Sequence, residues 1–435
     1  MTHSFKAVRA NRDRLTWAAF WCASAMVMAF ALATGDLSYR DERGYVTIAD
    51  SVLRGDGYQL DGETTAYRPP AWPLLLAVFR LLGTPIELLV AVSAALLVVS
   101  ALLARRIATH IAGPSAGWIA AFLLLLYPLN VYTAATLYPQ TLAMAALLGA
   151  VALSLDDPRA ARPWRGAAVG LLAVVVLYSA PTLAFAALIV VLWALWRFRQ
   201  QTLRFVVPAV LAGLLPVALW TARNAVAFDA FVPVSTATGV NLLLGNSAEA
   251  TPTSGVTADI DSYREAAERG AMTESEKSAF YTDAAFTWVS EHPDEAAQLY
   301  LGKVVNYFAP YNEPASATGG GTLERLVSYL TFVPLVALAL VRLALWRKFP
   351  PKPPELLLLT VFMSSAAFMA LTFTRTRFRQ PLDSMLIIEA AVCSALLAGM
   401  VLRERRADHQ SRVPRPRESG DEALGAASRR HQIGR

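Results

Sequence analysis

Two adjacent carboxylates, Asp41 and Glu42, closely follow the first long apolar run of the chain. A carboxylate can act as a general base that removes a proton from a hydroxyl or an amine. Far along the sequence, R-T-R-F-R-Q-P carries three arginines, Arg375, Arg377 and Arg379. Guanidinium groups bind phosphate oxygens in a bidentate manner. If the fold brings the two groups together, they could deprotonate an acceptor and stabilise a departing phosphate.

The residues around the carboxylates predict that they are held in place. Apolar or aromatic residues recur at helical spacing at Tyr45, Ile48, Ala49 and Val52. A short amphipathic helix should therefore follow the acids directly, and Gly55 with Gly57 should end it. Farther on, T-A-Y-R-P-P-A-W-P contains prolines that stiffen the chain, and its Arg68 offers another anion contact.

Both charged groups also have a plain structural interpretation. Acidic side chains in outer loops are commonly just solvated. Arginines at a bilayer surface can extend toward lipid headgroups without any catalytic role. These alternatives stay open from the local residues alone.

The composition is that of a membrane protein. Of the 435 residues, 55% are hydrophobic and 17% are charged, whereas soluble domains carry about a quarter charged residues. Cys22 and Cys393 both lie inside apolar runs, so they predict no disulfide. The net charge of +6 comes from basic residues beside apolar runs, a pattern that membrane topology explains better than nucleic-acid binding does.

We predict an all-α polytopic membrane protein with about ten transmembrane helices, juxtamembrane helices and a small helical outer layer. The candidate spans are Trp17–Thr34, Glu87–Ala104, Ser115–Val131, Pro139–Leu155, Gly166–Tyr178, Pro181–Trp196, Leu203–Ala222, Leu323–Trp346, Glu355–Phe373 and Pro381–Leu402. The twelve-residue run Ala71–Leu82 is short for a span and is interpreted as a helix at the outer interface.

Basic residues flank alternate ends of these spans, and the positive-inside rule then places both termini in the cytosol. The transmembrane domain covers residues 1–402, with outer loops 35–86 and 223–322, and a disordered basic cytosolic tail covers 403–435. The Arg375–Arg379 segment falls outside, against the positive-inside preference. An alternative for the first span is a cleaved signal peptide, because Ala31-Leu32-Ala33 resembles a cleavage site.

The two outer loops are acid-rich, and the second shows helical patterning. We predict helices over Ala258–Arg269 and Glu274–Ser290, with Thr273 as an N-cap that pairs with Glu276. Pro293 should open a third helix that runs to Phe308. These helices would form a folded layer on the membrane.

Four segments in this order resemble the GT-C type of integral-membrane glycosyltransferase. They are D-E-R-G-Y-V-T-I-A-D-S-V-L-R-G-D-G-Y with the following T-A-Y-R-P-P-A-W-P-L-L-L-A, then R-N-A-V-A-F-D-A-F-V-P-V-S-T-A-T-G-V-N-L-L-L-G-N-S, W-V-S-E-H-P-D-E-A-A-Q-L-Y-L-G-K and R-F-R-Q-P-L-D-S-M-L. The likeness is to bacterial relatives of the dolichyl-phosphate-mannose–protein mannosyltransferases and of the lipid A aminoarabinose transferase.

This resemblance implies transfer of a monosaccharide from a polyprenyl-phosphate carrier, with inversion, to an envelope lipid, glycan or protein at the outer leaflet of a bacterial inner membrane. Asp41 matches the catalytic base. Residues expected to contact substrate are Glu42, Tyr45, Tyr67, Arg68, Gln140, Asn246, Arg375, Arg377 and Arg379. No cofactor and no metal ligands are expected, although a divalent metal remains an alternative.

The sequence departs from the family pattern at two places. Y-P-Q-T has Gln140 where the family often has a second acid, and Y-S-A-P has Ser179 where a charged residue is common. An amide can bind a substrate but cannot act as a base. Two other functions therefore stay open, namely a transporter or flippase of a lipid-linked substrate and an inactive glycosyltransferase-like assembly partner.

Overall fold

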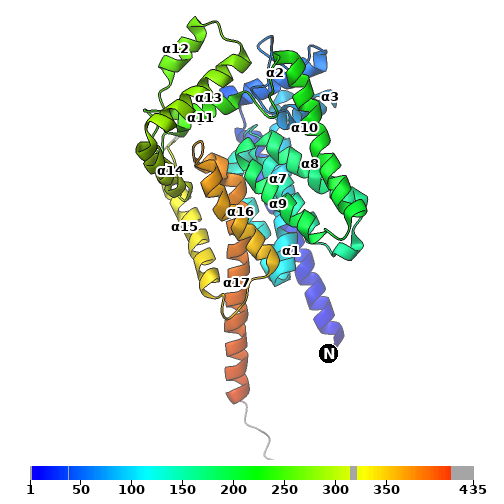
Figure 1. The fold of residues 1–435 in the computed structure, drawn as a ribbon. Helices are drawn as coiled ribbons and strands as arrows, with labels where there is room; N and C mark the ends of the chain where they lie inside the picture. Colours follow the sequence, from blue (N-terminus) through cyan, green and yellow to red (C-terminus); the bar gives the residue numbers. More distant parts are fainter. Residues whose placement is uncertain (1, 38, 314–320, 413–435) are drawn as a thin grey trace, which may run out of the picture.

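The computed structural model describes residues 2–37, 39–313 and 321–412, and these are mostly helical (Figure 1). Across these residues the strands are two short ones, β1 (Gln59–Leu60) and β2 (Glu63–Thr64). They pair antiparallel, with Gln59 opposite Thr64, and form a small hairpin in the first outer loop.

In the described residues, five helical segments are long and apolar enough to cross a bilayer. They lie at Asp13–Thr34 in α1 (Thr2–Thr34), Ile86–Ala112 over η1 (Ile86–Leu88) and α4 (Val90–Ala112), Thr202–Phe228 over η4 (Thr202–Val206) and α10 (Val207–Phe228), Thr322–Ala344 (α15), and Thr376–Arg405 in α17 (Thr376–Arg412). The pair α5 (Pro114–Leu126) and α6 (Pro128–Ala134) could form a sixth span, bent by 56°. Pro128 explains the bend, because it cannot donate a backbone hydrogen bond.

Five more apolar helical segments are shorter, so the predicted total of about ten spans stays a prediction. They are α3 (Ala71–Leu81), α7 (Gln140–Ser154), α8 (Pro163–Ser179), Pro181–Arg197 over η3 (Pro181–Leu183) and α9 (Ala184–Arg197), and α16 (Pro353–Met369). The predicted fold class is nevertheless confirmed, because the described chain is an all-α polytopic membrane protein.

The C-terminal end of the bundle differs from the prediction. Helix α17 begins at Thr376, ahead of Pro381, and continues to Arg412, ten residues beyond the expected end at Leu402. The extension reads R-E-R-R-A-D-H-Q-S-R, in which Arg, Glu, Ala and Gln favour helix. The disordered tail predicted from residue 403 is therefore wrong for residues 403–412, and residues 413–435 lie outside the described part.

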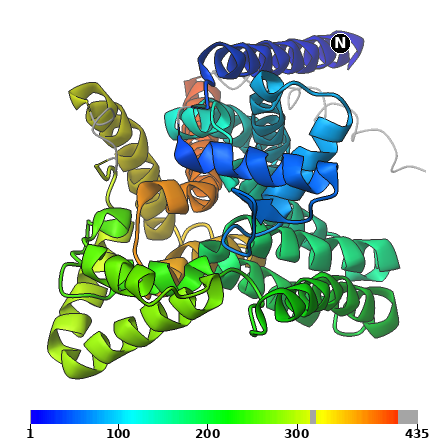
Figure 2. The ribbon, with the colours of Figure 1, turned by 90° about the horizontal axis from the view of Figure 1, so that it is seen from above.

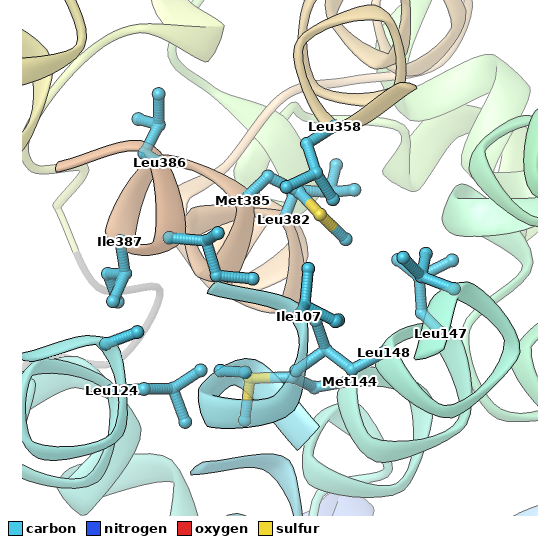
Figure 3. Packing of buried hydrophobic residues seen from close by; sticks show 14 of the residues in the cluster. Ile107, Leu124, Met144, Leu147, Leu148, Leu358, Leu382, Met385, Leu386 and Ile387 are labelled. Atoms are coloured by element: carbon cyan, nitrogen blue, oxygen red, sulfur yellow. The ribbon is translucent and has the colours of Figure 1, made fainter. Parts of the chain in front are cut away.

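The apolar core lies between the bundle helices. Residues far apart in sequence, among them Ile107, Leu124, Met144, Leu147 and Leu386, pack against one another there (Figure 3). Lipid tails are as apolar as these side chains, so the core stabilises the bundle through close van der Waals packing. This core holds the bundle helices together, and the outer layer packs on one end of the bundle.

The outer layer covers one end of the bundle, and the first residues of α1 and the end of α17 lie at the other end (Figure 1). It contains α2 (Arg40–Arg54), α11 (Ala237–Gly245), α12 (Asp261–Arg269), α13 (Glu274–Glu291) and α14 (Pro293–Tyr307). Viewed from above, α2 lies across the end of the bundle (Figure 2). The predicted capping box of Thr273 and Glu276 is confirmed at the start of α13.

A buried ion pair joins the first turns of α17. Arg379 and Asp383 are 1% and 0% exposed, with 2.8 Å between Nε and Oδ1. We expect Arg379→Leu to destabilise the protein by about 3–5 kcal/mol, because it leaves the Asp383 charge buried without its partner. Thermal unfolding in detergent measures this. The double variant Arg379→Leu/Asp383→Leu should recover most of the stability, and equal destabilisation of both variants would contradict the explanation.

Candidate functional site

The start of α2 is fixed by Glu42. One carboxylate oxygen accepts from the backbone N–H of Tyr39 at 2.9 Å, which forms a capping box, and the other accepts from Leu137 N–H at 2.8 Å. The side chain is 2% exposed, and burial raises its pKa despite these two bonds. One oxygen thus caps α2 and the other joins α2 to the segment between α6 and α7, which indicates a structural role for Glu42.

Asp41 lies in the same helical turn and points at two arginines. Its Oδ1 is 2.6 Å from Arg68 Nη2, and its Oδ2 is 3.5 Å from Arg377 Nη2. The Asp41 side chain is 36% exposed. Burial tends to raise its pKa, but the guanidiniums of Arg68 and Arg377 outweigh burial and hold the pKa below its usual value. Asp41 is therefore ionised at neutral pH and lies between two cations.

Aromatic rings support both guanidiniums. The Arg68 guanidinium lies 5.1 Å from the centre of the Tyr45 ring and 5.2 Å from that of Tyr67. The Arg377 guanidinium lies 3.4 Å from the centre of the Tyr138 ring. Tyr45 is buried below Arg68, whereas Tyr67 is 37% exposed. Cation–π contacts of this kind restrict the guanidiniums without neutralising their charge.

The other two arginines that were expected to bind phosphate, Arg375 and Arg379, lie away from Asp41. Arg375 donates to the backbone carbonyls of Ser254, at 3.1 Å, and Glu313. Arg379 is buried against Asp383 and also donates to the carbonyls of Tyr307 and, at 2.8 Å, Ala309. Arg375 precedes α17, which begins at Thr376. Arg377 and Arg379 lie two residues apart on this helix and therefore point to nearly opposite sides of it.

Asn246 belongs to a second polar cluster. Its Nδ2 donates to the carbonyls of Leu242 and Leu371, both at 2.9 Å, and its Oδ1 accepts from Lys303 Nζ at 3.1 Å. Lys303 is 1% exposed and also donates to the carbonyls of Gly245 and Thr372, both at 2.9 Å. Burial lowers the pKa of Lys303 to about 8.

Lys303 ends the segment L-Y-L-G-K, and no local pattern in the sequence predicts its contacts. Its three acceptors belong to two segments of the chain, with Gly245 and Asn246 at the end of α11 and Thr372 after α16. Lys303 thus holds the end of α11 and the chain before Arg375 to α14. The cluster has a structural role, and Asn246 is part of it.

Gln140 is buried at the first residue of α7, two residues after Tyr138. Its Oε1 has no hydrogen-bond partner in the described residues, nor has the Oγ of Ser179. Gln140 therefore lies close in sequence to the ring that supports Arg377 and adds no charge there.

A second acid that the sequence analysis missed, Glu274, joins the outer layer to the first outer loop. It accepts from Thr65 Oγ1 at 2.7 Å, from Ala66 N–H at 2.8 Å and from Thr236 Oγ1 at 2.6 Å. Thr65 and Ala66 shortly precede Arg68 in the chain. Glu274 therefore fixes the backbone that presents Arg68. Its position at the start of α13 was visible in the sequence, but its partners were not.

We expect Glu42→Gln to lower the stability by about 1–3 kcal/mol, because an amide cannot accept from both backbone N–H groups at once. The first turn of α2 loses its anchor in this variant, and thermal unfolding in detergent measures the effect. Glu63→Gln, an exposed acid of the hairpin, is the matched control. Unchanged unfolding of the Glu42 variant would show that the anchor is dispensable.

Known proteins were compared with this geometry in hand. No family model and no curated protein matches the chain. Among solved structures, the archaeal oligosaccharyltransferase AglB from Archaeoglobus fulgidus, in complex with an inhibitory peptide and a dolichol-phosphate, matches with a TM-score of 0.50 and 15% identity. The match covers 91% of this chain and 52% of AglB. The fold of this chain is similar to that of AglB.

Two structures of ArnT from Cupriavidus metallidurans are also similar. The one bound to undecaprenyl phosphate has a TM-score of 0.45 and 13% identity and covers 86% of this chain and 59% of ArnT. The apo form has a TM-score of 0.43 and 15% identity, and the match covers 88% of this chain and 78% of ArnT. The chain thus spans between half and three fifths of the first two proteins. The family resemblance of the sequence is confirmed at the level of the fold.

Proposed function

We propose that this chain is a membrane glycosyltransferase that moves a monosaccharide from a polyprenyl-phosphate carrier to an envelope lipid, glycan or protein at the outer leaflet. The observation that carries the proposal is the position of Asp41 between Arg68 and Arg377. One carboxylate and two guanidiniums are what the reaction needs, namely a base for the acceptor and cations for the departing phosphate. The dolichol-phosphate in the AglB structure supports a polyprenyl-phosphate carrier for this chain.

The donor phosphate would compete with Asp41 for the two arginines. Phosphate oxygens accept bidentate hydrogen bonds from guanidinium groups, so a bound donor would draw Arg68 and Arg377 away from the carboxylate. Losing its positive neighbours raises the pKa of Asp41 and makes it a stronger base. Donor binding would thus prepare the base for the next step.

In that step, Asp41 takes the proton of the acceptor hydroxyl or amine. The acceptor atom bonds to the anomeric carbon as the bond from that carbon to the phosphate oxygen breaks. The electron pair of the broken bond goes to the prenyl phosphate, whose negative charge the arginines stabilise. Attack from the face opposite the phosphate inverts the anomeric centre, as the family resemblance implies.

The surface beside the site suits a carrier whose prenyl chain stays in the bilayer. Helix α3 packs against α2 and exposes Leu74, Val78 and Leu81, at 43%, 52% and 74%. Exposed apolar side chains on a short helix fit the boundary between headgroups and acyl chains. The headgroup of a carrier lying there would be close to Arg68.

Mass spectrometry of envelope lipids and glycans from a deletion strain tests the proposal. One glycosylated species should disappear in the strain, return with the wild-type gene, and stay absent with Asp41→Asn. Return of that species with the Asp41 variant would refute the assigned base. A transporter would instead move its substrate across the membrane in purified vesicles without forming a glycoside.

A further inference from the structure

A groove of about 460 Å³ lies far from Asp41, and arginines line it. Its lining residues are Arg159, Ala161, Arg162, Pro163 and Arg204. The first four come from the chain around η2 (Pro158–Ala160) and the start of α8, and Arg204 belongs to the π-helix η4. Two separate segments therefore form the two sides of the groove.

The two sides are tightly packed against each other. A Cβ at Gly166 would lie 2.2 Å from the carbonyl oxygen of Phe205, and one at Gly170 would lie 2.0 Å from that of Ala209. Close backbone approach through glycine is typical of helix pairs in membranes. The Phe205 ring is fully buried and stacks on Phe198 at 3.9 Å between centres. The groove is thus built on a rigid junction.

The three arginines of the groove carry charge that the protein does not balance. In the described part of the chain, the side chains of Arg159, Arg162 and Arg204 form no hydrogen bond or ion pair. The nearby carboxylate of Asp156 is already engaged by Arg106 at 2.7 Å and Arg165 at 3.2 Å. Three like charges around one groove attract a multivalent anion.

The groove lies on the membrane surface opposite the candidate site. Helix α10 starts directly after η4 and has 22 residues, which gives a length of about 33 Å, close to the ~30 Å hydrocarbon thickness of a bilayer. Near its other end, Arg223 donates to the carbonyls of Thr65 and Tyr58 in the first outer loop. Figure 1 shows α10 running along the bundle toward α2 and α3.

Apolar side chains beside the groove favour a lipid over a soluble anion. Trp164 and Leu203 are neighbours in sequence of Pro163 and Arg204 and are 55% and 81% exposed. Tryptophan is enriched at headgroup level, where its ring contacts both lipid and water. We propose that this arginine groove binds the headgroup of an anionic phospholipid of the phosphatidylglycerol or cardiolipin type, in the leaflet opposite Asp41.

The proposal is tested on the purified full-length chain in detergent by native mass spectrometry with added phosphatidylglycerol or phosphatidylcholine. The groove variant is Arg159→Gln/Arg162→Gln/Arg204→Gln. The control variant, Arg347→Gln/Lys348→Gln/Arg403→Gln, removes the same charge near the ends of α15 and α17, at the same end of the bundle (Figure 1). All six side chains are exposed, so folding should be unchanged, and thermal unfolding without lipid checks this.

We expect the wild-type chain to prefer phosphatidylglycerol. Its affinity should fall about 100-fold in the groove variant, because each basic residue near the surface contributes about fivefold, and about 2-fold in the control, whose residues lie outside the groove. Equal losses in both variants would reduce the effect to general surface charge and overturn the proposal. Equal binding of both lipids would also overturn the proposal. Displacement of phosphatidylglycerol by inorganic pyrophosphate at equal concentration would overturn it too, because a soluble anion would then be the ligand.

Discussion

Replacing Asp41 with asparagine should lower the rate of glycosyl transfer by about 10²–10⁴-fold, the usual contribution of a general base. The amide keeps the size of the side chain and can still accept from Arg68, but it cannot take a proton. Stability should change little, because the Asp41 side chain is 36% exposed and exposed ion pairs contribute little. Quantitative mass spectrometry of the glycoside formed in isolated membranes measures the rate.

The matched control is Asp50→Asn on the same helix. Asp50 also pairs with an arginine, with Oδ1 2.9 Å from Arg80 Nε, and it is 27% exposed. Its variant loses the same charge and a comparable ion pair outside the candidate site. Equal loss of transfer in both variants would mean that α2 needs its ion pairs for folding and that Asp41 has no special role.

Replacing Arg377 with glutamine should slow transfer by about 10²–10³-fold, because the developing charge on the prenyl phosphate loses one cation. The pH profile should change as well. In the wild type, Arg377 helps to hold the pKa of Asp41 below its usual value, so activity is lost only when the pH falls through that lowered value. Without Arg377 the pKa rises, and the acid limb of the profile should move to higher pH.

Arg375→Gln is the control for this variant. Arg375 belongs to the same segment but donates to the carbonyls of Ser254 and Glu313. Its removal should loosen the outer layer without moving the acid limb. An acid limb that stays in place with Arg377→Gln, or that moves equally with Arg375→Gln, would remove the electrostatic link between Arg377 and Asp41.

Local patterns in the sequence predicted much of what positions the site. The helical spacing of Tyr45, Ile48 and Ala49 predicted α2, and all three side chains are buried. Gly55 ends that helix with a positive φ of 84°, which glycine adopts without strain. One refinement is that the acids lie inside the first turn of α2 and not before it, because Tyr39 and Glu42 form the capping box.

Long-range partners were the part that local patterns could not predict. Glu42 was expected to contact substrate, yet it binds the backbone N–H of Leu137, which lies 95 positions away in sequence. All three arginines of R-T-R-F-R were expected to contact substrate. The helix beginning at Thr376 leaves only Arg377 of these three against Asp41. Tertiary packing decides such contacts.

A double-variant cycle on the transfer rate tests most directly whether Asp41 and Arg377 act as one unit. The rates of Asp41→Asn, Arg377→Gln and the double variant are compared with the wild type, with the donor identified from the species lost in the deletion strain. Because each group depends on the other, the double variant should be at most about tenfold slower than Asp41→Asn alone. Fully multiplicative losses would show two independent residues and contradict the account.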